Sequence, residues 1–230
     1  MADAAPLEFH PFLAERFAEA VMPAAMILVV DHDPRPLERL LGAVSKADSV
    51  WLDVEATRLK VQAAAAAVAH LPRGEPPEEL ISVHHVGKDP HTGRDIILDP
   101  PEWARALNEV ARAFCVATGK ARGWNPHVLA TTDDGETLDK FVAAARALHP
   151  EALTWYSKLT AGMLAWMQGG ALRGYLSLAE VGKFREALQA DERQMFLWKE
   201  RGGDFHRRKL QAFCYLAEKH HLGLAAVATR

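Results

Sequence analysis

The 230-residue chain has few cysteines and no long apolar run, and both shortages narrow the classes to which it can belong. Its two cysteines, Cys115 and Cys214, lie far apart in apolar helical patterns, so we expect two buried thiols and no disulfide framework. The longest apolar run, Ala20–Val30, contains Pro23 and is much shorter than the roughly 20 residues of a membrane-spanning helix. The sequence therefore predicts a protein without a membrane partner, in a reducing compartment.

An excess of either charge is also missing, since 27 lysines and arginines face 30 acidic residues and the net charge is -3 at pH 7. Such a balance gives no general attraction to nucleic acid or to anionic membranes, so a nucleic-acid partner is not expected. The N-terminal segment carries Asp3, Glu8 and Glu15 without a basic region, so we expect no signal peptide. The predicted location is the cytoplasm.

The sequence has none of the common phosphate-binding or nucleophile motifs. It contains no P-loop, no G-x-G-x-x-G and no G-x-S-x-G pattern. We therefore expect no cofactor, and no complete catalytic constellation is visible along the chain.

What is present is an ordinary globular composition, with 49% hydrophobic and 25% charged residues, in which strand and helix patterns interleave. Helices are predicted over residues 11–22, 55–71 and 151–167, and after capping residues Asp33, Ser177 and Asp204. Short apolar runs predict strands at Met26–Val30, Leu80–Val86, Ile96–Leu98, Val128–Ala130 and Leu224–Thr229.

This order predicts an α/β or α+β fold: a helix-rich, single compact domain over residues 1–230, around a small mixed sheet with a closing C-terminal strand. Loop composition at Pro72–Pro77 and Gly169–Gly174 marks possible boundaries. A subdivision into residues 1–168 and 169–230 stays open.

The stretch Tyr175–Val181 reads YLSLAEV and leads into a helix that ends in Ala187 and Leu188. With the later residues Leu210 and Tyr215 and the strand Leu224–Val227, it resembles the YfbM-like family of uncharacterised small bacterial domains. The resemblance implies a small cytoplasmic bacterial protein. Because some proteins similar to this family sit near toxin genes, it also implies a toxin-immunity or regulatory role.

Acidic residues follow two apolar segments. An alternative function for the protein, as an enzyme, depends on them. Asp31 and Asp33 follow a run that resembles the first strand of a receiver domain, and Asp53 and Glu55 resemble the first motif of DEDD-type exonucleases. If these four carboxylates converge, they predict a metal-dependent phosphoryl-transfer or nuclease-like hydrolase. If they are dispersed as helix caps and helix starts, the leading hypothesis is a non-enzymatic protein that binds another protein.

Two further groups of residues are candidates for binding. His84, His85 and His91 surround a predicted hairpin turn and could bind a metal, although a polar hairpin is the simpler interpretation. A basic cluster near the C-terminus is predicted to bind a protein partner, and it consists of Arg201, His206, Arg207, Arg208 and Lys209.

Overall fold

The computed structural model describes residues 7–47, 54–75, 86–88, 95–97, 100–120, 127–129, 132–133, 136–160 and 172–228. At its centre is a four-stranded sheet in the order β4-β1-β8-β7, with antiparallel pairing throughout. Its strands are β1 (Leu7–Phe12), β4 (His127–Leu129), β7 (Leu172–Leu176) and β8 (Gly223–Ala228). Two short antiparallel pairs join β2 (Val86–Lys88) to β3 (Asp95–Ile97) and β5 (Thr132–Asp133) to β6 (Glu136–Thr137).

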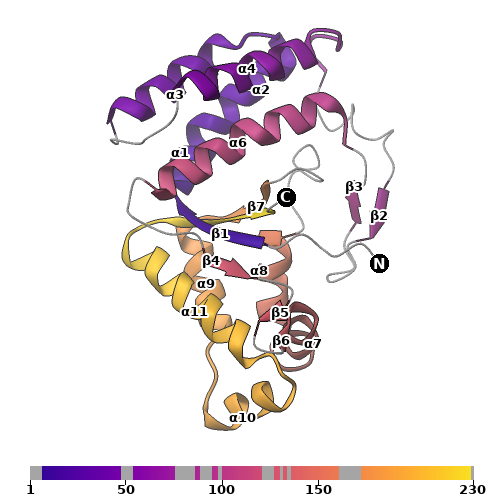
Figure 1. The fold of residues 1–230 in the computed structure, drawn as a ribbon, viewed down its shortest axis with the longest axis vertical. Coiled ribbons are helices and arrows are strands. Elements are labelled where there is room, and N and C mark those ends of the chain that lie inside the picture. The colour runs from indigo at the N-terminus through magenta and orange to yellow at the C-terminus, as the bar shows by residue number, and fades with distance from the viewer. Residues whose placement is uncertain are drawn as a thin grey trace.

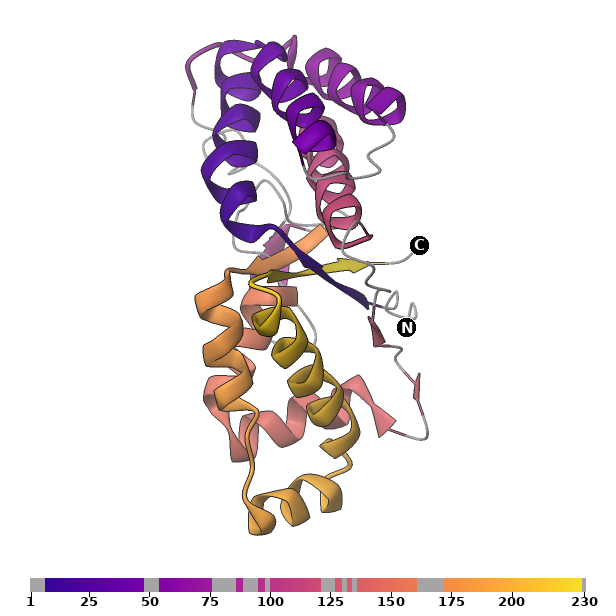
Figure 2. The ribbon, with the colours of Figure 1, turned by 90° about the vertical axis from the view of Figure 1, so that its left-hand side faces the viewer.

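Helices cover both faces of this sheet (Figure 1). The N-terminal layer, drawn above the sheet, comprises α1 (Ala14–Arg16), the π-helix η1 (Phe17–Val21), α2 (Met22–Asp31), α3 (Arg35–Ala47), α4 (Val54–Val68) and α6 (Glu102–Lys120). The C-terminal layer, drawn below it, comprises α7 (Leu138–Leu148), α8 (Pro150–Thr160), α9 (Leu178–Ala187), α10 (Glu192–Glu200) and α11 (Asp204–Lys219). Figure 2 shows the same division from the side.

The strands β1, β7 and β8 each contribute to two hydrophobic cores, one under each layer. On β8, Ala225 and Val227 belong to the core of the N-terminal layer, whereas Leu224 and Ala226 belong to that of the C-terminal layer. This assignment follows from the strand geometry, because successive side chains point to opposite faces. A strand buried on both faces is apolar at every position, which explains the unbroken LAAVA run.

The α+β class is confirmed, since the sheet is antiparallel and is packed between helices. The closing strand is also confirmed, and β8 lies inside the sheet between β1 and β7. The two sides of the possible boundary at residue 169 therefore pair within one sheet. Within the described ranges, no helix is both long and apolar enough to cross a membrane.

The strand predicted at Met26–Val30 is wrong, because these residues form the second half of α2. In α2 the buried residues Ala24, Ala25, Leu28 and Val29 recur at helical spacing. A short continuous apolar run fits a buried helix as well as a buried strand, and periodicity alone does not separate the two. The helix predicted from residue 11 begins at Ala14 instead, because Leu7–Phe12 pairs with β8.

Candidate binding groove

Of the four carboxylates of the alternative function, the three that the structure describes, Asp31, Asp33 and Glu55, do not form a metal site. Asp33 accepts hydrogen bonds from the Arg35 backbone N–H at 3.0 Å and from the guanidinium at 2.8 Å, which lower its pKa to about 2. This contact confirms the predicted role of Asp33 at the start of α3. Glu55 is 3.1 Å from the guanidinium of Arg58, Asp31 ends α2, and Asp53 lies outside the described residues.

The predicted metal-binding histidines His84, His85 and His91 also lie outside the described residues. An antiparallel pair is present near them, since β2 pairs with β3, but β2 begins at Val86, where the strand predicted at Leu80–Val86 ends. Within the described ranges, no group of three or more His, Cys, Asp or Glu side chains could hold a metal ion.

The predicted basic cluster is divided by burial. Arg201 and Arg208 are exposed, and the ammonium of Lys209 lies 3.9 Å from the centre of the Phe205 ring. His206 and Arg207, in contrast, are buried at 0% and 2% exposure and do not belong to an accessible surface. They lie on the face of α11 that also buries Leu210, Phe213 and Cys214, so helical periodicity turns them inward.

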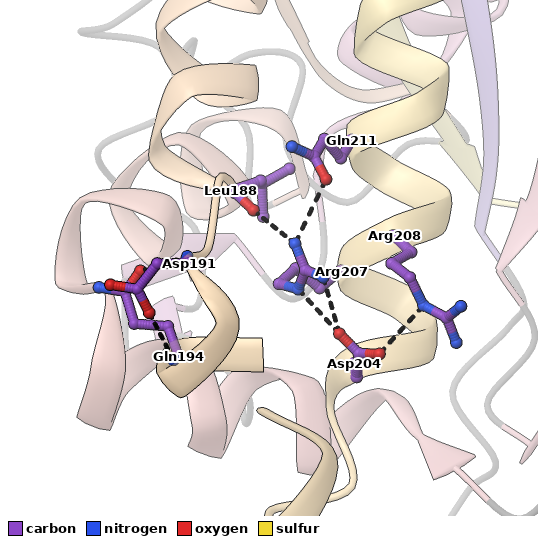
Figure 3. A network of polar contacts seen from close by, with 7 residues as sticks. All are labelled: Leu188, Asp191, Gln194, Asp204, Arg207, Arg208 and Gln211. Carbon is purple, nitrogen blue, oxygen red and sulfur yellow. Dashed lines mark hydrogen bonds and ion pairs between the residues drawn. The ribbon is translucent and has the colours of Figure 1, made fainter. Parts of the chain in front are cut away.

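Arg207 of α11 connects its own helix to the end of α9 (Figure 3). Its guanidinium donates to Asp204 Oδ1 at 3.0 and 2.8 Å, to the backbone oxygen of Leu188 at 2.9 Å and to Gln211 Oε1 at 3.3 Å. Arg208 holds the second oxygen of Asp204 at 3.0 Å. Because Leu188 ends α9, these bonds fix the corner between α9 and α10 against α11.

At the same corner, a pair of hydrogen bonds between Asp191 and Gln194 starts α10 (Figure 3). The Asp191 side chain accepts from the Gln194 backbone N–H at 2.8 Å, and the Gln194 side chain accepts from the Asp191 backbone N–H at 3.1 Å. This capping box satisfies donors that the first turn of a helix leaves unpaired. The path of the chain from α9 into α10 is therefore fixed at both ends.

Stacked aromatic rings lie against this corner. Trp198 of α10 is fully buried, and its ring stacks on Phe141 at 5.7 Å and on His149 at 5.9 Å between ring centres. The guanidinium carbon of Arg207 lies 6.0 Å from the centre of the Trp198 ring. Burial, and secondly the positive charge of Arg207, hold the pKa of His149 below its usual range, so its imidazole is mostly neutral at pH 7.

A groove of about 550 Å³ opens beside His149, between α8 and α9. Its volume lies within the range of typical ligand sites. In its lining, the Trp155 side chain is half-buried, whereas most of the charged and polar side chains are exposed. The residues that line it are His149, Glu151, Thr154, Trp155, Lys183, Glu186, Ala187 and Gln189.

Trp155 is the aromatic surface of this groove. The ammonium groups of Lys158 and Lys183 each lie 5.9 Å from the centre of its ring, within the range of cation–π attraction. Lys158 is also ion-paired with Glu180, which completes the capping box of α9 with Ser177. Lys183 has no such ion pair within the described part of the chain.

The sequence did not reveal this groove, because its residues come from two helices that only tertiary packing brings together. One local signal was available in α8, where Ala152, Tyr156 and Leu159 form the buried stripe. Trp155 directly precedes Tyr156, so its large aromatic side chain lies at the edge of the buried face.

Comparison of the chain with models of protein families, with curated proteins and with solved structures gave no significant match. The resemblance of Tyr175–Val181 to the YfbM-like family therefore stays a prediction. Within this stretch, Ser177 and Glu180 form the capping box that starts α9.

Proposed function

We propose that the protein acts by binding another protein, and that the partner docks in the α8–α9 groove. The observation that carries this proposal is the groove itself: a concave site with an aromatic floor at Trp155 and a charged rim. Protein interfaces concentrate their binding energy on aromatic and arginine anchors in such pockets. A toxin-immunity or regulatory factor, as the family resemblance implies, would act by binding of this kind.

Two features of the surrounding structure support a binding role. The corner behind the groove is fixed by Arg207 and by the capping box at Asp191, so the floor does not need to be ordered when a partner arrives. A preorganised surface loses less conformational entropy on association. The rim carboxylates Glu151 and Glu186 would repel phosphate groups, which favours a protein over a nucleic acid as the partner.

The test is affinity capture with the full-length tagged chain in cells of the organism that encodes it. We expect a stoichiometric partner that is lost by at least about tenfold with Thr154→Arg, which fills the groove from an exposed position, and with Trp155→Ala. Tyr215→Ala is the matched control, because Tyr215 is 51% exposed on α11 outside the groove.

Thermal unfolding of all three variants shows whether a loss of capture reflects a loss of the fold. Recovery of no stoichiometric partner, or equal capture by the wild-type chain and both groove variants, would contradict the proposal.

A further inference from the structure

We infer that the groove receives an arginine side chain of the partner protein. This inference rests on the proposed function and adds the chemistry of the contact. It is carried by three properties of the groove: its unpaired carboxylates, its aromatic floor, and the lysine that already lies over that floor.

The charges of the groove favour a cationic occupant. Neither Glu151 nor Glu186 has an ion pair or a side-chain hydrogen bond to another described residue, whereas Glu180, also on α9, is paired with Lys158. Among the described residues of the lining, Lys183 is the only lysine or arginine, and His149 adds little positive charge because its pKa is lowered. The lining therefore carries two negative charges against one positive charge, and an anionic ligand would face a net repulsion.

The helix ends reinforce this preference. Glu186 lies in the last turn of α9, where the unpaired carbonyl groups give the helix a partial negative charge and favour a cation. Glu151 lies in the first turn of α8 and faces the groove from that helix. The lining therefore offers a cation two carboxylates that have no ion pair among the described residues.

The indole of Trp155 accounts for arginine in particular. Arginine stacks on tryptophan more often than lysine does, and its planar guanidinium can contact a carboxylate while it stacks. Lys183 lies over the ring from an exposed position and is not held by an ion pair among the described residues, so a partner's guanidinium can displace it at little cost. In the free protein, Lys183 thus takes the place that the partner's arginine would occupy.

The experiment is a titration of the ¹⁵N-labelled full-length protein, followed at the indole N–H signal of Trp155, which its loss in Trp155→Phe assigns. The first probe is N-acetyl-arginine amide, and its control is N-acetyl-citrulline amide, which has nearly the same shape without the charge. We expect saturable binding of the arginine probe in the millimolar range and binding of citrulline that is about tenfold weaker. A Gly-Ser peptide with one central arginine should bind at least as well as the amide.

Variants separate the charge effect from a loss of shape. Glu186→Gln should weaken binding of the arginine probe by about threefold, and Lys183→Met should strengthen it by a similar factor. Glu200→Gln is the matched control, since Glu200 is an exposed acid on α10 outside the groove lining, and it should leave binding unchanged. Equal binding of arginine and citrulline, no effect of Glu186→Gln, or binding of the free amide but not of the peptide would each overturn the inference.

The two proposals fail in different ways. If capture of a partner depends on Thr154 and Trp155 but the arginine probe does not bind, the protein-binding function stands and only the arginine is wrong. If no variant of the groove affects partner capture, the proposed function itself is lost, whatever the probes do.

Discussion

The two helical layers share one sheet but bury different kinds of residue. In the described helices of the N-terminal layer, the buried polar side chains are the neutral Thr57 and Asn108. The C-terminal layer buries an ion pair, between Asp204 and Arg207, together with His206. It also carries the groove and both capping boxes found on described helices. The N-terminal layer is therefore held mainly by apolar packing. In the C-terminal layer, a buried ion pair fixes the corner between α9 and α10.

Buried charge is a poor source of stability, because desolvation offsets much of the attraction between the two groups. Its better-supported use is to fix one arrangement among several. We apply that interpretation to Arg207, which Asp204 and Gln211 hold on α11 while it donates to the Leu188 backbone oxygen at the end of α9. The bonds of Arg207 in the C-terminal layer therefore fix the backbone next to the groove. The following substitutions test this contrast.

The largest effect is expected for Arg207→Met in the C-terminal layer. The substitution removes the strongest partner of the buried Asp204 carboxylate and leaves the Leu188 carbonyl without its donor, so we expect a loss of about 3–5 kcal/mol in the free energy of unfolding. Urea denaturation measures it. Arg208→Met is the matched control: its side chain is 62% exposed, and its loss should cost less than about 1 kcal/mol. Similar losses for both variants would contradict the account.

The corresponding test in the N-terminal layer is Asn108→Ala in α6. The Asn108 amide donates to the Leu172 backbone oxygen at 2.9 Å and accepts from the Leu172 N–H at 2.8 Å, so it completes the outer edge of β7. Its loss leaves two buried backbone groups unpaired, and we expect a cost of roughly 2–4 kcal/mol. Gln62→Ala, at an exposed position of α4, should change stability by less than about 0.5 kcal/mol in the same urea experiment. A cost for Asn108→Ala as small as that of the control would show that the edge does not need these bonds.

Two glycines give the next contrast, one on the sheet where it meets α8 of the C-terminal layer and one in the N-terminal layer. A Cβ added at Gly174 of β7 would lie 2.6 and 2.7 Å from the backbone oxygens of Lys158 and Leu159, so Gly174→Ala should cost about 1–3 kcal/mol. At Gly42 of α3 an added Cβ meets no atom of the described residues within 4 Å, and Gly42→Ala should stabilise the protein by up to about 1 kcal/mol. Thermal unfolding of the two variants should therefore shift in opposite directions. A shift in the same direction would mean that α8 does not approach β7 this closely.

The smallest expected effect is the pH dependence that His149 contributes. Its pKa is lowered in the folded protein, first by burial and then by the charge of Arg207, from an unfolded value near 6.5. Between the folded and unfolded pKa values, the unfolded chain binds a proton that the folded chain does not, so stability falls as the pH drops through this window. Unfolding at about pH 7.5 and about pH 5.5 should show a larger acid loss for the wild type than for His149→Gln. An equal loss in both proteins would show that His149 does not contribute to the pH dependence of stability.

Local pattern predicts those parts of the fold in which one helix face or one capping motif decides the structure. The buried stripe of α11, with Leu210, Phe213 and Cys214, and the capping box at Ser177 follow from spacing alone. The helix α10 is missed because its sequence is mostly polar, although Asp191 and Gln194 already have the spacing of a capping box. The strand β7 is missed because Arg173 and Gly174 interrupt a short apolar run.

The candidate site is less predictable than the fold, for a physical reason. A charged residue near a helix start reads as solvent-exposed, and nothing local shows that Arg207 is buried against the end of α9. Likewise, the groove joins Glu151 and Trp155 of α8 to Glu186 of α9, which are brought together only by packing. Such sites depend on contacts between distant segments, which residue spacing does not encode.

The most direct test of the central claim compares the two layers inside living cells. A photo-crosslinking amino acid is placed at Thr154, on the rim of the groove, or at Gln62, exposed on α4 of the opposite layer. If the partner docks in the α8–α9 groove, we expect one discrete crosslinked species from Thr154 after irradiation, and none from Gln62. The same crosslinked species from both positions, or a species from Gln62 alone, would contradict the claim that the protein binds its partner through the α8–α9 groove.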